Sequence, residues 1–187
     1  MALKYIELVR VDNLKEELAD FYASYENQNQ INNDVGSAKE DDNKSVLDEL
    51  NKLAKNSEET DEIYITDEIL VGEDKDVKPG IYDLEIIGGL GNVFGKRSTF
   101  QSLPINWAVS DKENSAGYPS SIRIILFNDD ILSFRDISKV KFNTISDEVE
   151  SSNELGIGQF IVGRDISPGE YKLSTNVEMD PQFENLG

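Results

Sequence analysis

The sequence predicts an α+β fold in which an N-terminal helical element precedes an antiparallel β-sandwich or a partly open barrel. Two observations favour this class. Apolar residues recur at helical spacing within residues 1–60, whereas beyond them they gather in short runs rich in β-branched and aromatic side chains. The length of 187 residues suits one β domain with an accessory element.

The first helical segment is expected near the N-terminus, where neither Pro nor Gly occurs before Gly36. A polar, Asn-rich linker is expected to follow at residues 27–44. A lone amphipathic helix has to bury its apolar stripe against something. The apolar positions of this stripe are mostly three or four residues apart: Ile6, Val9, Leu14, Leu18, Phe21, Tyr22 and Tyr25.

A second helix is expected after the linker, with Asp42 or Asn43 as its N-cap. Together the two helices would form a helical hairpin or a short coiled coil. Such an element either packs without a site of its own or sets the oligomeric state. One face of the second helix is apolar, through Val46, Leu50, Leu53 and Ala54.

Seven strands are expected from residue 61 onward. Two of them flank a turn at Asn128, Asp129 and Asp130, which predicts a hairpin over residues 122–136. The strands are EIYIT (62–66), ILVG (69–72), IYDLEII (81–87), INWAVS (105–110), SIRIILF (121–127), ILSFR (131–135) and VKFNTI (140–145). Their bulky core members are expected to be Tyr82, Trp107, Phe127, Phe134 and Phe142.

One phrase occurs twice in the chain. DVKPGIYDL at residues 76–84 matches DISPGEYKL at residues 165–173, with Asp, Pro, Gly, Tyr and Leu identical at a constant offset of 89 residues. Upstream, ILVG at 69–72 matches FIVG at 160–163, and the first copy holds two extra residues between Val-Gly and the Asp. A repeat at a fixed offset indicates a repeated structural unit.

The chemistry of this phrase predicts a corner between two strands. Pro-Gly suits the central positions of a type II turn, and an Asp three residues before the Pro can accept backbone N–H bonds. The apolar residue after the Asp, Val77 or Ile166, is expected to point into the core. Tyr82 and Tyr171 would each open the next strand, on the same face as the Leu two residues later.

Residues 162–173, VGRDISPGEYKL, resemble the VGxDIxPGxYxL corner of small β repeat modules in lipoproteins and surface proteins of Gram-positive bacteria. In those modules the corner is followed by a hairpin. Residues 122–136, IRIILFNDDILSFRD, resemble that hairpin. The resemblance spans residues 62–187 and implies binding or scaffolding, since the functions of such modules are mostly unknown. The chain departs from the pattern in the two extra residues before Asp76, and it has no recognisable export signal and no Cys for lipid attachment.

These patterns divide the chain into the helical element at residues 1–60, one full repeat copy at 61–150 and a partial second copy at 151–187. The second copy is too short to bury a core alone. Its strands, at residues 158–163 and 170–175, are therefore expected to pair with the first copy or with another chain. A homo-oligomer could form through the helices or through this partial copy.

Composition excludes several functional classes. The chain has no His and no Cys, so a Ser-His-Asp triad, a thiolate nucleophile, a zinc–cysteine site and a disulfide are all impossible. Its net charge of −19 repels nucleic-acid phosphates and anionic lipids, and no window is apolar enough for membrane insertion. Cations, and basic patches on a protein or a cell-wall component, remain compatible partners.

Acidic loops are the candidate cation ligands. Glu73, Asp74 and Asp76 share one loop, and Asp129 and Asp130 share another. Neither loop has the full spacing of an EF-hand, with its Gly and terminal Glu. Solvated turn acids are the simpler interpretation, so no metal site is expected.

Two further loops are candidate functional elements. GGLGNVFG, residues 88–95, has neither the spacing nor the Lys-Ser/Thr of a phosphate loop, and it predicts a flexible hairpin or a bulge. The turn-rich loop at residues 115–121 displays Tyr118 and could act as a recognition loop.

We therefore expect no catalytic residue and no cofactor, and a ligand-binding site whose residues the sequence does not identify. The expected function is that of a non-enzymatic binding or scaffold module of a bacterial cell-surface or envelope protein. The alternative is an intracellular or phage-type structural assembly protein whose helices drive oligomerisation.

Overall fold

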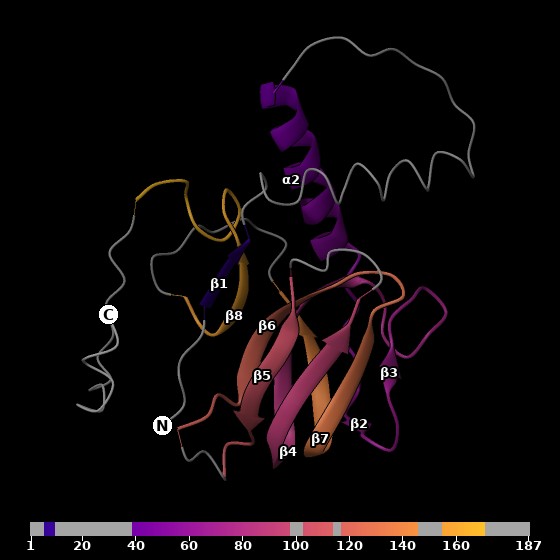
Figure 1. Cartoon of the computed structure of the whole chain (residues 1–187). Helices are drawn as coiled ribbons and strands as arrows, with labels where there is room; N and C mark the ends of the chain where they lie inside the picture. Colours follow the sequence, from indigo (N-terminus) through magenta and orange to yellow (C-terminus); the bar gives the residue numbers. More distant parts are fainter. Residues whose placement is uncertain (1–5, 10–38, 98–102, 114–116, 146–154, 171–187) are drawn as a thin grey trace, which may run out of the picture.

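A computed structural model describes residues 6–9, 39–97, 103–113, 117–145 and 155–170. Within these ranges the chain forms one helix and eight strands (Figure 1). The elements are β1 (Ile6–Val9), α2 (Lys39–Lys55), β2 (Ile63–Tyr64), β3 (Ile69–Leu70), β4 (Gly80–Lys96), β5 (Ile105–Ser110), β6 (Ser121–Leu126), β7 (Ile131–Thr144) and β8 (Gly158–Ile161).

All eight strands belong to one mixed sheet. Its order is β1-β8-β6-β4-β7-β2, with β3 added beside β7 and β5 beside β4. The pairs that involve β4 or β7 are antiparallel, whereas β8 runs parallel to both β1 and β6. Among the described residues no pairing joins β1 to β2, so the sheet is open.

The expected α+β arrangement, a helical element followed by an antiparallel sandwich or partly open barrel, is wrong. Residues 6–9, whose apolar spacing predicts a helix, form β1 and pair with β8 from Ile6↔Gly158 to Val9↔Ile161. The backbone partners that β8 supplies come from far along the chain, and local periodicity does not reveal them. Residues 10–25 of the expected helix, and residues 27–38 of the expected linker, lie outside the described residues.

The second expected helix is confirmed as α2, although it begins earlier than its apolar pattern predicts. It starts at Lys39, so Asp42 and Asn43 lie inside the helix rather than at its N-cap. Its apolar face packs within the chain, against one end of the sheet (Figure 1). The buried contacts join Val46, Leu50 and Ala54 of α2 to Ile81, Ile125, Phe127 and Ile161.

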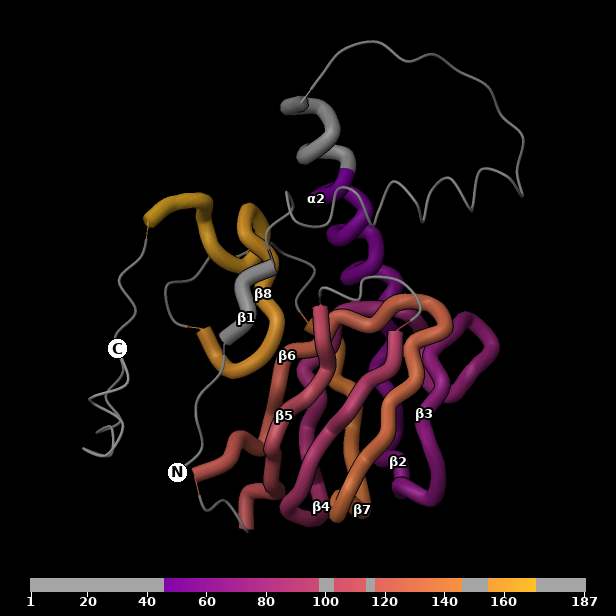
Figure 2. The backbone as a smooth tube through the Cα atoms, viewed as in Figure 1, coloured from indigo at the N-terminus to yellow at the C-terminus, as the bar shows by residue number. Residues whose placement is uncertain are grey.

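β4 and β7 are longer than the sequence predicts. The two strands expected at residues 131–135 and 140–145 are one continuous strand, β7. β4 continues past residue 87 through the glycine-rich stretch to Lys96. The two strands run side by side along most of their length (Figure 2).

The two ends of β4 must lie near each other. Leu126 pairs with Gly80 at the start of β4, and Ile131 pairs with Lys96 at its end, yet only residues 127–130 connect β6 to β7. A connection of that length spans at most roughly 19 Å, whereas a straight strand as long as β4 would run for about 54 Å. β4 therefore bends, and the sheet folds over on itself.

The bend lies at the glycine-rich stretch, which confirms the predicted bulge. The register between β4 and β7 shifts three times between Ile86 and Asn92. Gly89 has a φ of +103°, and a Cβ there would lie 2.3 Å from the carbonyl oxygen of Asp136. At Gly91 the corresponding distance, to a backbone oxygen of β7, is 1.9 Å. Glycine is needed because the β7 backbone approaches too closely for any side chain.

The folded sheet encloses the larger of two apolar clusters, and the smaller one lies beneath α2. The expected core aromatics are confirmed except that Phe134 is only half-buried against the larger cluster. The buried ones are Tyr82, Trp107 and Phe142 in the larger cluster and Phe127 in the smaller one.

The hairpin predicted over residues 122–136 is only partly right. Its turn forms, with Asp129 at a φ of +65° and the N–H of Asp130 donating to the carbonyl of Phe127 at 3.2 Å. However, β6 and β7 do not pair with each other, because β4 lies between them. A turn signal identifies a reversal, but not the strands that become neighbours.

Candidate functional site

The two copies of the repeated phrase place their Asp residues in the same way. In the first copy the Asp76 carboxylate accepts the backbone N–H of Leu70 at 2.8 Å. In the second copy the Asp165 carboxylate accepts the N–H of Ile161 at 2.7 Å. The prediction that each Asp binds a backbone N–H and starts the chain reversal is confirmed in both copies.

The apolar residue after each Asp closes the corner. Val77 forms an isolated parallel bridge with Val71, and Ile166 forms the same bridge with Val162. Val77 is 2% exposed and Ile166 is 5% exposed. Both side chains therefore point inward, as the sequence predicts.

The first Pro-Gly step does not form the expected type II turn. Gly80 is not among the residues with positive φ, and it is the first residue of β4. A Cβ at this position would lie 2.5 Å from Oγ of Ser57 and 2.7 Å from the ring of Tyr82. Glycine is used here because the chain that leaves α2 packs closely against β4. Tyr171, the expected start of the strand after the second corner, lies outside the described residues.

We expect the two Asp residues to differ strongly in their contribution to stability. Asp76 is exposed, whereas Asp165 is 9% exposed and lies 3.6 Å from Arg123 and 3.5 Å from Arg164. Asp165→Ala should lower the free energy of unfolding by about 2–4 kcal/mol, because the buried Arg164 and the partly buried Arg123 lose a partner. Asp76→Ala should cost about 1 kcal/mol. Urea unfolding of the matched pair measures both costs, and equal costs would contradict the argument.

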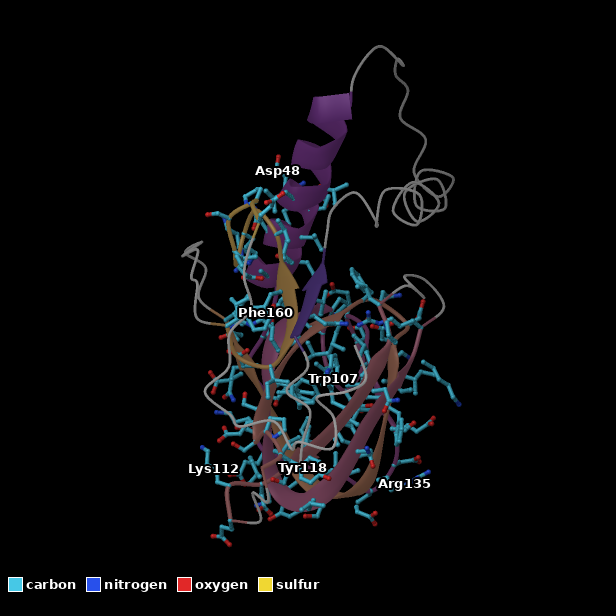
Figure 3. All side chains as sticks on the ribbon, turned by 60° about the vertical axis from the view of Figure 1, so that its left-hand side comes forward. Asp48, Trp107, Lys112, Tyr118, Arg135 and Phe160 are labelled. Atoms are coloured by element: carbon cyan, nitrogen blue, oxygen red, sulfur yellow. The ribbon has the colours of Figure 1, made fainter. Side chains whose placement is uncertain are left out.

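Arg123 connects the second corner to the sheet. Its guanidinium donates two hydrogen bonds to Asp83, at 2.9 and 3.0 Å, and lies 3.6 Å from Asp165. It also stacks 5.0 Å from the ring centroid of Phe160. Figure 3 shows Phe160 on β8, toward α2, with Trp107 nearer the middle of the sheet. This cluster holds β8 against β6.

Two further side chains of the second copy bind the rest of the fold. The Gln159 side chain accepts the N–H of Ile125 at 3.0 Å and donates to the carbonyl of Pro104 at 3.5 Å. Arg164 donates to Asn51 of α2 at 2.9 Å. The predicted pairing of the second copy with other parts of the chain is therefore confirmed for β8. Of the second expected strand, residues 170–175, only residue 170 is among the described residues.

A second buried ion pair joins the turn before β7 to the end of β4. Nε of Arg97 lies 3.1 Å from Asp130, and these side chains are only 3% and 2% exposed. The same guanidinium donates to the carbonyls of Leu103, at 2.7 Å, and Ile125. The Asp130 carboxylate also accepts the N–H of Phe127 at 3.0 Å. Asp130, a candidate cation ligand by sequence, is instead a structural acid.

The Asp130 carboxyl should titrate near neutral pH. Burial raises its pKa from 3.8 to about 6, although the Arg97 guanidinium and the N–H of Phe127 oppose the shift. The folded state thus binds this proton more tightly than the unfolded chain, so its contribution to stability is complete below pH 4 and is lost as the pH rises through 6. The loss is roughly 3 kcal/mol. Carboxyl 13C NMR should give a midpoint near pH 6, and a midpoint below 4 would contradict the argument.

The other acidic candidates form no cluster. Glu73, Asp74 and Asp129 are exposed. In the described part of the chain, no three acidic side chains come together in a way that could hold a metal ion. Tyr118, the aromatic of the expected recognition loop, is half-buried rather than exposed. No helix in the described ranges is long and apolar enough to cross a membrane.

The feature best suited to binding is a sheet edge that no described strand covers. β5 and β6 lie end to end along the same side of β4, β5 beside residues 90–95 and β6 beside residues 80–85. The N–H of Asp111 points toward β4, since it donates to the carbonyl of Gly89 at 2.8 Å. N–H groups alternate in direction along an antiparallel strand, so those of Asn106 and Ala108 point away from β4.

Most N–H groups of β5 and β6 that point away from β4 have hydrogen-bond partners. The carbonyl before β8 accepts the N–H of Arg123, and a side chain of β8 accepts that of Ile125. The loop before β6 accepts the N–H of Ser110. In the described part of the chain, the outward backbone groups of Asn106 and Ala108 have no such partner. The unpaired groups therefore lie together on one strand.

The inner face of β5 is apolar. Ile105, Trp107 and Val109 are buried in the larger cluster. The indole N–H of Trp107 has no hydrogen-bond partner within the described part of the chain, although the side chain is only 5% exposed. Such a group is costly to leave unpaired. The edge of β5 thus combines unpaired backbone groups with an apolar inner row.

Sequence reasoning missed the buried side chains of Arg97 and Gln159 and the partly buried Arg123, and it missed the edge. Nothing around the two Arg residues distinguishes them from solvated ones. INWAVS does carry a weak signal of an edge that could accept another strand. Pro and charged residues usually protect edge strands from such pairing, and this segment contains neither. Comparison with protein-family models, with curated proteins and with solved structures finds no match to this chain.

Proposed function

We propose that this chain is a non-enzymatic binding or scaffold module of a bacterial cell-surface or envelope protein. The observation that carries the proposal is that its buried and partly buried charged groups bind other parts of the same fold. Asp130 and Asp165 bind backbone N–H groups, and Arg97 and Arg123 bind the turns and strands around them. These contacts stabilise a rigid frame, which is what a binding or scaffold module needs.

Two further points support the proposal. The repeated corner is a structural device in both of its copies, as expected for a module built by repetition. The envelope location rests on the resemblance of that corner to surface-protein modules. The alternative, an assembly protein whose helices drive oligomerisation, is less well supported, because the apolar face of α2 packs on the sheet.

The test is fold-dependent binding to cell envelopes. We expect the purified chain to co-sediment saturably with envelope fragments of Gram-positive cells. The control is Gly89→Ala, which keeps the net charge but should lose the fold. Equal retention of both proteins would show charge-driven adsorption and would contradict the proposal, as would no retention of the folded chain.

A further inference from the structure

We propose that the free edge of β5 binds an extended basic segment of a partner protein as an added β-strand. This inference rests on the proposed binding function and gives it a site and a class of partner. The site is the outward backbone edge of Asn106 and Ala108, together with the apolar side chains between and beside them.

The backbone chemistry of the edge selects an extended polypeptide. Asn106 and Ala108 each direct one N–H and one C=O away from β4, about 6.8 Å apart along the strand. A chain in β conformation presents donors and acceptors at the same spacing, so it can form a ladder of hydrogen bonds here. Strand addition of this kind draws its affinity from main-chain bonds.

β5 is also the least protected of the described edges. β2 and β3 have two residues each, and β1 has four and includes the charged Glu7. β6 is covered by β8 and by the Gln159 side chain. In contrast, β5 pairs with β4 in unbroken register over six residues and contains neither Pro nor a charged residue. Long, regular and uncharged edges are the ones that accept another strand.

The side chains around the edge define the partner. On the inner face an added strand would lie beside Ile105, Trp107 and Val109, so its alternate residues should be apolar. On the outer face it would lie beside Asn106 and Ala108, which are exposed and neutral. The chain as a whole carries a net charge of −19. Basic outward residues would therefore be attracted, whereas a second copy of this chain would be repelled.

Hydrogen exchange of the full chain provides the first test. In the free protein we expect the amides of Asn106 and Ala108 to exchange at least about tenfold faster than those of Trp107 and Val109, which donate to β4. Slow exchange at Asn106 and Ala108 would overturn the proposal, because it would mean that the edge is already covered. Slowing that appears only at high protein concentration would do so too, since the occupant would then be a second copy.

A synthetic peptide provides the second test. The probe is an alternating valine–lysine peptide with blocked ends, and its control is the same peptide with every backbone nitrogen methylated, so that neither edge of the control can pair. Both carry the same charge, but only the probe can form the ladder. We expect saturable binding of the probe, with slower exchange at Asn106 and Ala108. Equal binding of both peptides would overturn the proposal.

A matched pair of protein variants completes the test. Ala108→Pro removes an outward N–H without removing a bond to β4, so the strand should tolerate it. We expect the probe to bind this variant at least about tenfold more weakly, and Ala108→Ser, which keeps the N–H, to bind it as before. Equal affinity for the two variants would overturn the proposal. If Ala108→Pro fails to fold, the hydrogen-exchange measurements on the unmodified chain still decide whether the peptide binds at the β5 edge.

The two proposals can fail separately. If the chain binds envelope fragments in a fold-dependent way but Ala108→Pro binds them equally well, the β5 edge is not the site and the binding function stands. If the probe protects Asn106 and Ala108 but envelope fragments do not bind, the edge is a strand-binding site and the envelope function is wrong.

Discussion

Replacing Gly89 with Ala should abolish the folded state or lower the free energy of unfolding by about 2–5 kcal/mol. The φ of +103° alone costs an L-residue roughly 1–2 kcal/mol. The new Cβ would also lie 2.3 Å from the carbonyl oxygen of Asp136, and forced contacts of this kind cost about 1–3 kcal/mol more. Because the bend of β4 depends on this approach, we expect both halves of the sheet to lose stability together.

The variant Gly117→Ala separates the cost of the positive φ from the cost of the close contact. Gly117 also has a positive φ, +88°, but a Cβ there would meet no atom of the described residues within 4 Å. Its substitution should cost only roughly 1–2 kcal/mol from backbone strain. Urea unfolding followed by circular dichroism measures both variants. If Gly89→Ala costs no more than Gly117→Ala, the close approach of β7 is not what requires glycine in the bend.

Replacing Arg97 with Met should cost about 3–5 kcal/mol at pH 8, because it leaves the Asp130 carboxylate buried without its partner. The cost should be smaller at pH 5. The Asp130 pKa is about 6, so the carboxyl is already largely protonated there and less charge is left unpaired. Some cost should persist at pH 5, since the guanidinium also binds the carbonyls of Leu103 and Ile125.

The double variant Arg97→Met with Asp130→Asn identifies the cause. It removes both charges while the Asn side chain can still accept the N–H of Phe127. We expect it to be more stable than Arg97→Met alone at pH 8, and a double-mutant cycle gives the coupling between the two residues. A double variant no more stable than the single one would mean that lost packing, rather than the unpaired carboxylate, dominates.

The corner was predictable in detail, and much of the candidate site was not. The Asp, the following apolar residue and the Val-Gly pair all act over a few residues, so their roles follow from local chemistry. The exception is Gly80, whose expected turn conformation is replaced by a packing role against Ser57 and Tyr82. That role depends on where α2 ends relative to β4, which local chemistry does not determine.

The free edge could not be derived from INWAVS. The alternation of Ile105, Trp107 and Val109 predicts a half-buried strand, and that prediction is confirmed. Whether such a strand has one neighbour or two depends on where β6 and β8 lie, and these come later in the chain. In the structure β8 covers β6, and among the described strands β5 pairs with β4 alone.

The sequence by itself determined most of the strands, the apolar face of α2, the bulge in the glycine-rich stretch and the repeated corner. Each of these depends on side chains within a few positions of one another. Only the tertiary structure decided that residues 6–9 form a strand, that β4 separates β6 from β7, and that Arg97 and Asp130 meet in the interior. The physical reason is that strand pairing uses backbone groups that every residue carries. The choice of partner therefore follows from packing across the whole sheet, which no local pattern records.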